Sequence, residues 1–373
     1  MKIVVVVNSL GSGGAERVAT TLANAWADAG AKVQLVATYS GRGTIFYPVG
    51  PGVAVRFLAD MVPGRSAGKL FFFLRLGKLR QIIRSERPTV VVSHLTNVNV
   101  MTILATCLLR VPLIICEHNN PLVDGRSLFW RIASRLTYRF ASCVSVLTHD
   151  VVAPYKALLP GVGNMAVIPN PLPADMPSAP MRPNGASGRF RVVGVGRLQY
   201  QKQFDLLIRM FSRLSKEFDN WDLYIWGEGP ERPALEELID QLGLRRRVFL
   251  PGRTNALWEE LANCDLFALS SRFEGWSMAL MEAMALGLPA VAFDCPSGPR
   301  DLTERGVSGR LVENGNADDF VAALRSMMSK SSADRQSLGR LGADSVRGRF
   351  SLARVTALWD AEFRKIGVLE EVR

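Results

Sequence analysis

The sequence has few of the residues that hold metal ions or form disulfides. Among 373 residues there are five cysteines and three histidines, with no C-x-x-C pair and no H-E-x-x-H pattern. An odd set of cysteines without paired spacing predicts neither a disulfide framework nor a thiolate metal site, and is typical of a reducing compartment. The scarcity of histidine disfavours a zinc site. We therefore expect free thiols and no zinc centre.

Long apolar runs are also missing. The longest apolar stretch, residues 276–293, contains Glu282, Gly287 and Pro289, which disfavour a membrane-spanning helix. The apolar run at residues 3–7 is too short for the core of a signal peptide and leads into a polar, glycine-containing segment instead of a cleavage site. We expect no membrane span, and we interpret residues 3–7 as a first β-strand.

The chain does contain enough apolar residues for two cores, together with an uneven excess of positive charge. Hydrophobic residues make up 48% and charged residues 21%, and the net charge is +11. Residues 1–165 hold 18 Lys and Arg against 7 Asp and Glu, whereas residues 166–373 hold 27 of each. The first half is therefore expected to meet nucleic acid, an anionic membrane surface or a phosphorylated substrate, unless its cations only form a solvated face.

A proline-rich segment divides the chain into two halves with a similar order of predicted strands and helices. Six prolines between residues 169 and 183 predict an extended linker over residues 169–189. Each half opens with a β-branched run that ends at a glycine-containing turn and leads into a helical pattern. The opening strand and helix are expected at 3–7 and 15–28 in the first half, and at 190–195 and 203–218 in the second.

Short strands continue to alternate with helices along both halves. The further strands are expected at 33–37, 89–93, 113–116 and 143–147, and then at 223–226, 248–250, 266–270 and 290–293. Such alternation is typical of parallel sheets with right-handed crossovers. The sequence therefore predicts an α/β protein with two Rossmann-like lobes, residues 1–168 and 190–350, that face each other across a cleft.

In lobes of this kind, ligands bind beyond the carboxyl ends of the strands, so the residues just after each strand are the candidates for a site. The first such segment, GSGGAER at residues 11–17, offers glycines that let backbone N–H groups approach an anion. Its spacing is not G-x-G-x-x-G, and no acidic residue follows strand 33–37 to bind the ribose of NAD. A dehydrogenase is therefore disfavoured, and a plain tight turn remains open.

The second half places cations and carboxylates in the corresponding positions. Arg197 and Lys202 follow its first strand, where a guanidinium fork and an ammonium suit a diphosphate, although each alone would be an ordinary surface cation. Glu274 and Glu282 lie eight residues apart where a strand meets a helix. Because about 3.6 residues make a helical turn, their side chains are expected to reach different parts of one elongated ligand.

In their order along the chain, these motifs resemble those of the retaining glycosyltransferases of family 4, which have the two-lobe GT-B architecture and use nucleotide sugars. The matching parts are the GGAER loop, Glu117-His118, GRL-x-x-QK, E-x7-E and CPSGPRD at residues 295–301. In particular, the sequence looks like transferases that add N-acetylgalactosamine and related sugars to polyprenyl-diphosphate-linked glycans. The resemblance also implies that a C-terminal helix, residues 351–373, packs back on the first lobe.

The resemblance implies that the enzyme transfers a hexose or N-acetylhexosamine, with retention, from a nucleotide sugar, and we expect the nucleotide to be UDP. The acceptor would be a polyprenyl-diphosphate-linked glycan of surface polysaccharide biosynthesis. A GDP-mannose-dependent mannosyltransferase and a GT-B-type UDP-sugar epimerase are the alternatives. A noncatalytic carbohydrate-binding protein is disfavoured, because the cations and carboxylates described above are all present.

The resemblance also implies a role for each site residue. The catalytic residues would be His118, Arg197, Lys202 and Glu274. His118 would approach the sugar from the first lobe, although a lone histidine after a buried strand is also typical of a core. The donor would be bound by loop and helix-start residues of both lobes. These are Gly13, Gly14, Arg197, Lys202, Arg253, Glu274, Gly275, Trp276, Ser277, Met278 and Glu282.

Within this donor site, the two cations would neutralise the diphosphate as charge develops on the leaving group. Glu274 would hold sugar hydroxyls and Glu282 the ribose hydroxyls. Arg253 would contact the base, and Trp276 and Ser277 would select the sugar.

No two aspartates stand at positions i and i+2, so the D-x-D metal holder of the other major glycosyltransferase architecture is missing. We expect no cofactor and no divalent metal, with charge compensated by Arg197, Lys202 and helix ends. The family implies a front-face substitution through an oxocarbenium-like state, in which the departing phosphate oxygen takes the proton of the acceptor.

A basic segment sets the first lobe apart. Residues 65–87 hold seven basic residues and one acidic residue and predict a basic amphipathic helix, unless Gly77 breaks it. A second basic series recurs at near-helical spacing over residues 126–139. Solvated arginines beside core-facing apolar residues are the alternative interpretation of both.

By the same resemblance, the basic segment would bind the acceptor diphosphate and the lipid surface, placing the protein on the cytoplasmic face of the membrane. The residues expected to do so are Lys69, Arg75, Lys78, Arg80 and Arg84. No nucleic-acid-binding module is recognisable, so nucleic acid is not expected as a partner.

Overall fold

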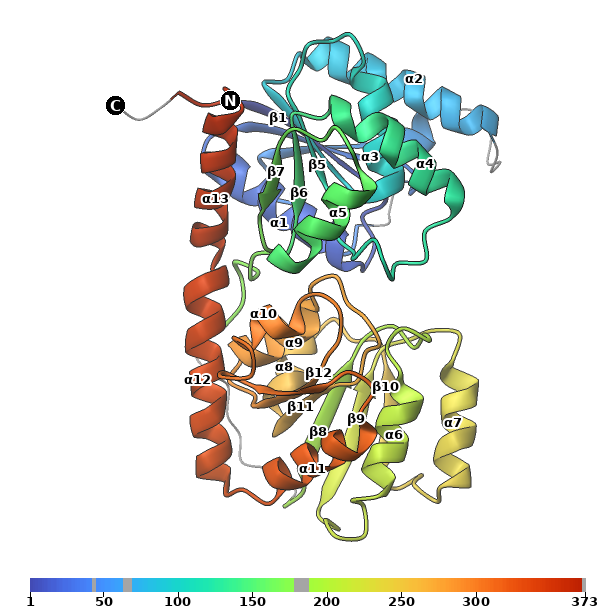
Figure 1. Cartoon of the computed structure of the whole chain (residues 1–373), viewed down its shortest axis with the longest axis vertical. Helices are drawn as coiled ribbons and strands as arrows, with labels where there is room; N and C mark the ends of the chain where they lie inside the picture. The colour runs from blue at the N-terminus through green and yellow to red at the C-terminus, as the bar shows by residue number, and fades with distance from the viewer. Residues whose placement is uncertain (42–44, 63–68, 178–187, 371–373) are drawn as a thin grey trace. The chain divides into compact units, whose positions relative to one another are not determined.

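Residues 1–41, 45–62, 69–177 and 188–370 are described by the computed structural model, and they form two compact units (Figure 1). Unit 1 comprises Met1–Pro173 and Leu352–Arg373, and unit 2 comprises Ala174–Ser351. The first unit thus ends a few residues beyond the expected boundary at 168. Residues 178–187 of the expected linker lie outside the described residues.

Unit 1 is built on a seven-stranded parallel sheet with the order β3-β2-β1-β4-β5-β6-β7. The strands are β1 (Lys2–Val7), β2 (Lys32–Ala37), β3 (Val53–Phe57), β4 (Val90–His94), β5 (Leu113–Cys116), β6 (Cys143–Val146) and β7 (Met165–Val167). The central strands β4, β5 and β6 are buried along their whole length. Strands are buried along their whole length in this way because helices cover both faces of a parallel sheet.

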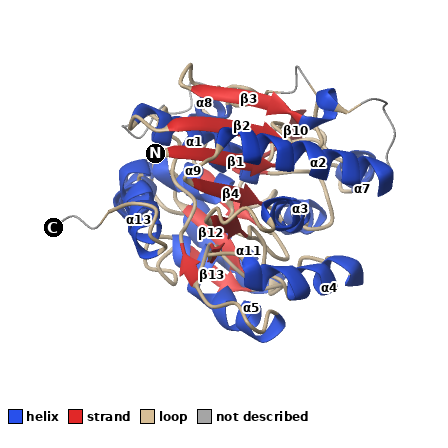
Figure 2. Cartoon of the chain, turned by 90° about the horizontal axis from the view of Figure 1, so that it is seen from above, coloured by secondary structure: helices blue, strands red, loops and turns tan. Residues whose placement is uncertain are grey.

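The helices of unit 1 pack against one another in two groups. They are α1 (Gly14–Asp28), α2 (Lys69–Glu86), α3 (Thr96–Thr106), α4 (Leu128–Thr137), α5 (Val152–Leu158) and α13 (Leu352–Lys365), with short 3-10 turns at Leu58–Met61, Tyr138–Phe140 and His149–Val151. Helix α3 lies between α2 and α4, and α13 contacts α1 (Figure 2). The α1–α13 contact is aromatic: the Trp26 ring lies 5.4 Å from that of Trp359 and 5.7 Å from that of Phe363.

Unit 2 is built on a six-stranded parallel sheet with the order β10-β9-β8-β11-β12-β13. The strands are β8 (Phe190–Val195), β9 (Trp221–Trp226), β10 (Val248–Gly252), β11 (Leu266–Leu269), β12 (Ala290–Asp294) and β13 (Arg310–Glu313). The helices are α6 (Phe204–Ser212), α7 (Arg232–Gln241), α8 (Leu257–Ala262), α9 (Met278–Ala285), α10 (Pro299–Leu302), α11 (Ala317–Met328) and α12 (Ser332–Phe350).

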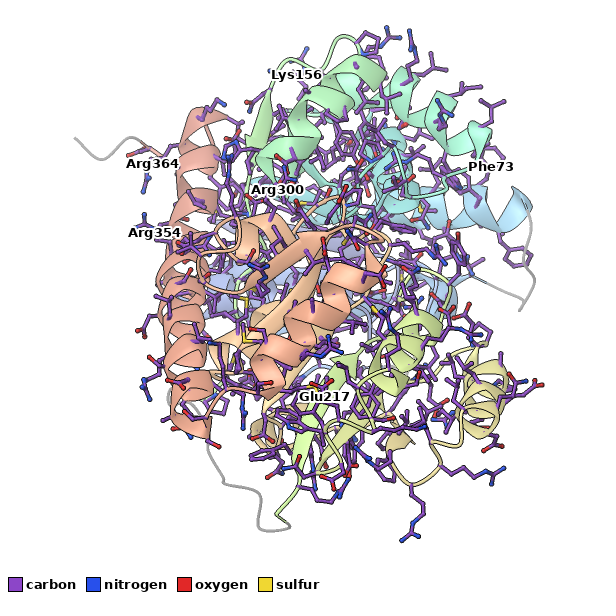
Figure 3. The ribbon with its side chains drawn as sticks, turned by 60° about the horizontal axis from the view of Figure 1, so that its bottom comes forward. Phe73, Lys156, Glu217, Arg300, Arg354 and Arg364 are labelled. Carbon is purple, nitrogen blue, oxygen red and sulfur yellow. The ribbon has the colours of Figure 1, made fainter. Side chains whose placement is uncertain are left out.

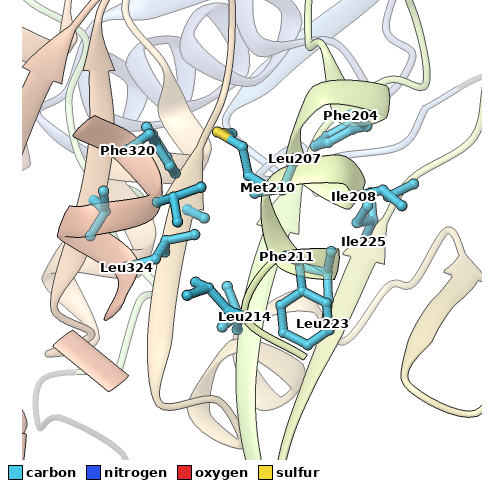
Figure 4. Packing of buried hydrophobic residues seen from close by; sticks show 14 of the residues in the cluster. Phe204, Leu207, Ile208, Met210, Phe211, Leu214, Leu223, Ile225, Phe320 and Leu324 are labelled. Atoms are coloured by element: carbon cyan, nitrogen blue, oxygen red, sulfur yellow. The ribbon is translucent and has the colours of Figure 1, made fainter. Parts of the chain in front are cut away.

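The core of unit 2 joins helices α6 and α11 to the sheet (Figure 4). Phe211 and Leu207 of α6 and Phe320 of α11 are completely buried, and the Phe320 ring lies 4.6 Å from that of Phe293 on β12. Burying side chains of this size contributes roughly 1.5–3 kcal/mol each. This packing fixes the carboxyl ends of the strands, where the site residues follow.

Each sheet has a point at which the strand order reverses. In unit 1 the reversal falls between β1 and β4, and in unit 2 it falls between β8 and β11. Loops that leave the two neighbouring strands there diverge to opposite faces of the sheet, which opens a crevice for a ligand. The loops after β8 and β11 are therefore the first place to examine for a site.

The predicted α/β class with two parallel, Rossmann-like sheets is confirmed. Three strands escaped prediction, and each for a physical reason. Edge strand β3 has one buried residue among five and contains Arg56, so it lacks the buried apolar run of a central strand. Strands β7 and β13 are only three and four residues long and are poorly buried. Helix α6 ends at Ser212, short of the expected residue 218.

Helix α2 confirms the predicted basic helix from residue 69 onward and runs through Gly77 without a break. An added Cβ at Gly77 would meet nothing within 4 Å, so this glycine is an ordinary exposed helix residue. None of the helices in the described ranges is both long and apolar enough to span a membrane.

Candidate functional site

A buried ion pair joins the two loops at the reversal point of unit 2. Lys202, after β8, places its Nζ 2.6 Å from Oε1 of Glu274, after β11, and the two side chains are only 16% and 6% exposed. The Ser271 hydroxyl donates to the same Oε1 at 2.6 Å. Within the described residues no hydrogen bond reaches the second oxygen, Oε2. Glu274 thus keeps Oε2 as an acceptor for a ligand, and Lys202 keeps further N–H donors.

Hydrogen bonds from side chains to backbone carbonyl oxygens hold these two loops together. Gln201 Nε2 donates to the carbonyl oxygen of Phe273 at 3.0 Å, and the Ser270 hydroxyl donates to that of Lys202 at 2.9 Å. A buried ion pair is favourable only where its geometry is well fixed, because both ions lose their hydration. These contacts supply that fixed geometry, and no sequence motif predicted them.

Two further cations stand exposed at the same edge of the sheet. Arg197 follows β8 and Arg253 follows β10. In the described part of the chain no hydrogen bond or ion pair engages the Arg197 side chain. Arg197, Lys202 and Arg253 therefore all lie just beyond the carboxyl ends of unit 2 strands, as their positions in the sequence predicted.

The start of α9 presents hydroxyl and N–H groups. Ser277, the residue before α9, has a left-handed backbone with φ of 58°, is 6% exposed, and makes no side-chain cap bond. Its Oγ and that of Ser297, after β12, are both buried without a partner among the described residues. Free N–H groups and hydroxyls at a helix start favour an anion. Gly275 and Met278 flank Ser277 and are partly exposed.

Glycines allow the loops at this edge to touch. A Cβ on Gly298 would lie 2.7 Å from the carbonyl oxygen of Trp276, and one on Gly227 would lie 1.8 Å from that of Gly196. Both glycines also have positive φ, at 98° and 146°. A side chain at either position would force the loops after β8, β9, β11 and β12 apart. Gly298 belongs to the CPSGPRD motif, whereas Gly227 was not identified from the sequence.

Glu282 is the fifth residue of α9, about one turn into the helix instead of the two turns expected, and it is only 1% exposed. Trp258 of α8 donates its indole N–H to Oε2 of Glu282 at 3.0 Å. The carboxylate is therefore held by a partner that sequence reasoning missed.

Trp276 corrects one expectation. Its indole is 3% exposed, donates to Sδ of Met281 at 3.2 Å, and lies edge-on to the ring of Phe350 at 4.9 Å. The side chain fills the core between α9 and α12, so it does not select a sugar. Only the backbone of Trp276 remains as a candidate ligand contact.

In unit 1, the glycine loop after β1 carries a carboxylate at the start of α1. Gly13 is the residue before α1 and Gly14 its first residue. The Glu16 side chain accepts a hydrogen bond from the Ser9 hydroxyl at 2.8 Å, and a Cβ on Gly13 would lie 2.1 Å from its Oε2. An anion approaching this helix start must therefore displace the Glu16 carboxylate.

His118 follows β5 and is paired with a second histidine. Nε2 of His118 lies 2.9 Å from Nδ1 of His94, the last residue of β4. The two rings are 9% and 1% exposed. Burial lowers the pKa of His118 to about 4 and also lowers the pKa of His94, so both rings are neutral at pH 7. The sequence did not identify His94.

Glu117, next to His118, is the centre of a buried network. Its carboxylate accepts hydrogen bonds from Thr96 at 2.9 Å, Tyr155 at 3.0 Å and Arg126 at 3.1 Å, and also from the hydroxyl of Tyr138. The network anchors the segment that carries His118.

Helix α2 uses its cations in different ways. Arg80 donates to the carbonyl oxygens of Ala105 at 3.0 Å and Cys107 at 2.6 Å, at the end of α3. It thus compensates the negative end of that helix, which corrects its assignment to the acceptor. The Arg75 guanidinium lies 4.8 Å from the ring centre of Tyr39.

The remaining cations of α2 are more accessible. Lys78 donates to Gln81 at 3.3 Å, and Arg84 is exposed in the last turn. The side chain of Lys69 lies outside the described residues. Phe73 projects from the same helix and is 63% exposed (Figure 3).

Known proteins match both units. Residues 13–171 match the model of the glycosyl transferase 4-like domain, and residues 181–343 match that of the glycosyl transferases group 1. The amylovoran biosynthesis glycosyltransferase AmsD of Erwinia amylovora is 30% identical over 334 residues, which cover 88% of this chain and 90% of AmsD. The chain belongs to the group 1 glycosyltransferases. These matches confirm the glycosyltransferase family that the sequence motifs predicted.

Other relatives of this glycosyltransferase agree in sequence and in fold. An α-1,4-N-acetyl-D-galactosaminyltransferase of Campylobacter jejuni, named for an acceptor linked to PP-undecaprenol, is 26% identical over 332 residues and 88% of each chain. The structure of HepE from Anabaena in complex with UDP matches with a TM-score of 0.78 at 19% identity, covering 99% of this chain and 100% of HepE. The fold is thus that of GT-B glycosyltransferases.

No group of three histidine, cysteine, aspartate or glutamate residues that could hold a metal ion occurs among the residues that the structure describes.

Proposed function

We propose that this glycosyltransferase moves a hexose or N-acetylhexosamine, with retention, from a UDP-sugar to a polyprenyl-diphosphate-linked glycan. The observation that carries the proposal is the Lys202–Glu274 pair at the reversal point of unit 2, which joins a cation for phosphate to a carboxylate for hydroxyl groups. Support for the donor comes from the UDP bound to HepE, and support for the acceptor from the name of the Campylobacter relative.

In this proposal the diphosphate lies against the loop after β8 and the start of α9. Arg197 and Lys202 donate charge-assisted hydrogen bonds that strengthen as the phosphate leaves. Lys202 is already oriented by Glu274 at 2.6 Å, so little reorganisation is needed when the donor arrives. Ser277 adds a hydroxyl that lacks a protein partner in the described residues.

The sugar is proposed to bind at Oε2 of Glu274, since Oε1 is occupied by Lys202 and Ser271. Glu282, held by Trp258, accepts from the ribose hydroxyls, and Arg253 lies toward the base. Within unit 1, His118 and the Gly13-Gly14 turn are proposed to contact oxygen atoms of a substrate.

The acceptor attacks on the face from which the phosphate departs. A leaving phosphate oxygen held by Arg197 and Lys202 takes the acceptor proton as the glycosidic bond to phosphate breaks and the new one forms. We propose that no divalent metal takes part, because the two cations and the α9 start supply the positive charge. Turnover in excess chelator tests this; loss of activity that magnesium or manganese restores would contradict it.

Helix α4 offers unit 1 a surface for the membrane. Four apolar side chains of α4 are exposed by 49–69%, namely Leu128, Phe129, Ile132 and Leu136. Exposed arginines at 131, 135 and 139 accompany them, and no acidic residue occurs between Asp124 and Asp150. A cavity of about 240 Å³ lies beside them, between α4 and α5. Apolar side chains flanked by arginines fit an anionic lipid surface.

We therefore propose that the α4 surface holds the enzyme on an anionic leaflet, with Phe73 and Arg84 of α2 as additional contacts. Each cation near such a leaflet contributes about 1 kcal/mol, so several together give reversible binding.

A donor screen tests the reaction directly. The enzyme is incubated with a panel of UDP- and GDP-sugars and a polyprenyl-diphosphate-linked glycan, and products are read by mass spectrometry and by NMR of the new linkage. We expect one UDP-sugar to be transferred with its anomeric configuration retained. Transfer of mannose from GDP-mannose, or an epimerised UDP-sugar formed without acceptor, would instead establish the alternative functions.

A further inference from the structure

The buried pair of histidines in unit 1 determines which hydrogen-bonding group His118 can present. His94 ends β4 and His118 follows β5, and the two strands pair in parallel with His94 opposite Cys116. Their ring centres are 5.1 Å apart, with Nδ1 of His94 2.9 Å from Nε2 of His118. At this distance one nitrogen must donate a proton and the other must accept it.

Neither ring carries a second proton at neutral pH. The pKa of each is lowered chiefly by burial, and for His94 also by the neighbouring ring. Glu117, although adjacent in sequence to His118, directs its carboxylate to Thr96, Tyr155 and Arg126. Each ring is therefore a neutral imidazole with one N–H.

Two arrangements of these protons are possible, and they differ at the far side of His94. Nε2 of His94 is buried and has no hydrogen-bond partner among the described residues. If His118 Nε2–H donates to His94 Nδ1, the single ring proton of His94 must lie on its Nε2. That Nε2–H then remains buried and unpaired. If His94 donates from Nδ1, its Nε2 is instead a bare lone pair. Unpaired buried N–H groups are rarer than unpaired acceptors, so the second arrangement is favoured.

We infer that His94 is a positioning residue that fixes His118 as the Nδ1–H tautomer, so that His118 offers a hydrogen-bond donor and not a proton acceptor. His94 Nδ1–H donates to His118 Nε2, and the remaining nitrogen of His118 carries its only proton. Such a group suits an oxygen acceptor, that is, a sugar hydroxyl or a phosphate oxygen of the donor. This step rests on the proposed function, and it leaves the proton of the acceptor to the departing phosphate.

The backbone after β4 is consistent with a fixed ring position. Leu95 has φ of 77°, an unusual value for a residue with a side chain, and its N–H donates to the carbonyl oxygen of Cys116 at 3.1 Å. This contact ties the end of β4 to the end of β5, and so holds the two histidines at a constant separation.

The tautomer can be observed without any substrate. The chain has three histidines, so protein labelled with ¹⁵N-histidine gives few signals in a two-bond ¹H–¹⁵N correlation spectrum. His149 is exposed, and the H149Q and H94N variants assign the signals. We expect a protonated Nδ1 and a bare Nε2 for His118. A protonated Nε2 on His118 would overturn the inference.

Substitutions of His94 connect the tautomer to the reaction. Asparagine places an amide nitrogen near the position of Nδ1, whereas glutamine places one near Nε2 and leucine none. We expect H94N to keep kcat within about threefold, and H94Q and H94L to lose about tenfold in kcat with little change in the KM of the donor, as for one lost hydrogen bond. H149Q is the matched control and should keep full activity.

Three results for the His94 variants would contradict the inference. If H94L retains the Nδ1–H tautomer of His118, or changes the tautomer without lowering kcat, His94 does not act through His118. A common loss of Tm and activity in all three His94 variants would indicate a structural role only. If no sugar is transferred from any donor, the proposed function fails, while the NMR experiment still decides the tautomer.

Discussion

Removing the charge of Lys202 has two separable consequences, one for stability and one for catalysis. The K202M variant leaves the Glu274 carboxylate, whose side chain is 6% exposed, with the Ser271 hydroxyl as its partner at Oε1. Removing one member of a fully buried ion pair costs about 3–5 kcal/mol. Because Lys202 is 16% exposed, we expect the lower end of that range, about 3 kcal/mol.

This loss of stability should lower Tm by a measurable amount. Unit 2 spans residues 174–351, and for a domain of that size each kcal/mol shifts Tm by roughly 2–4 °C. Calorimetry or circular dichroism should therefore show a fall of about 6–12 °C for K202M. The K202M/E274Q double variant removes both charges and should recover most of that fall. The control R213M breaks an exposed pair, Arg213–Asp318, and should change stability by under about 1 kcal/mol.

Activity should not recover with stability. Lys202 is proposed to bind the leaving diphosphate, and losing one such charged donor lowers kcat by about 100-fold or more. K202M and the double variant should therefore both be nearly inactive, although only K202M is unstable. A K202M enzyme with unchanged Tm, or a double variant as unstable as the single one, would refute the buried-pair reasoning. An active double variant would refute the role in catalysis.

Arg197, the exposed arginines near α4 and His118 can each be tested in the same way. R197A should lower kcat about 100-fold with a smaller change in donor KM, since the charge that Arg197 meets grows toward the transition state; unchanged kcat would contradict that role. Replacing the exposed arginines at 131, 135 and 139 by serine should weaken binding to anionic liposomes about 100-fold in a flotation assay, because each cation contributes ~1 kcal/mol. A control variant that lacks the charges of Arg213, Arg325 and Arg354 should bind like wild type. Because burial lowers the folded-state pKa of His118 to about 4, against about 6.5 when unfolded, the contribution of His118 to stability should be constant above pH 6.5 and fall by about 3 kcal/mol between pH 6.5 and 4. The pKa of His94 is lowered too, so His94 adds a loss of the same sign. In pH-dependent denaturation, H118Q should lose the His118 contribution and keep that of His94; an unchanged dependence in H118Q would contradict this.

The central part of the fold could be predicted because its strands are short, buried and β-branched. Strands β1, from Ile3 onward, and β5 are continuous apolar runs, since helices cover both faces of the sheet. Edge strand β3 could not be found, because two of its five residues are exposed and only one is buried. The positions of Arg197, Lys202 and Glu274 followed from the strand ends, but their contacts did not.

Side-chain partners were the part that the sequence could not supply. Arg80 and Trp276 looked like a lipid contact and a sugar contact, yet one caps α3 and the other fills a core. Conversely, His94 and Trp258 carried no local signal, because their partners His118 and Glu282 are 24 residues away along the chain in each case. Only the packing of the sheet and its helices brings these pairs together.

The most direct test of the account is a crystal structure of the enzyme with an uncleaved UDP-sugar. We predict that the diphosphate contacts Lys202 Nζ and the Arg197 guanidinium, and that a sugar hydroxyl contacts Oε2 of Glu274. A nucleotide bound elsewhere, or one whose phosphates leave Lys202 and Arg197 untouched, would contradict it.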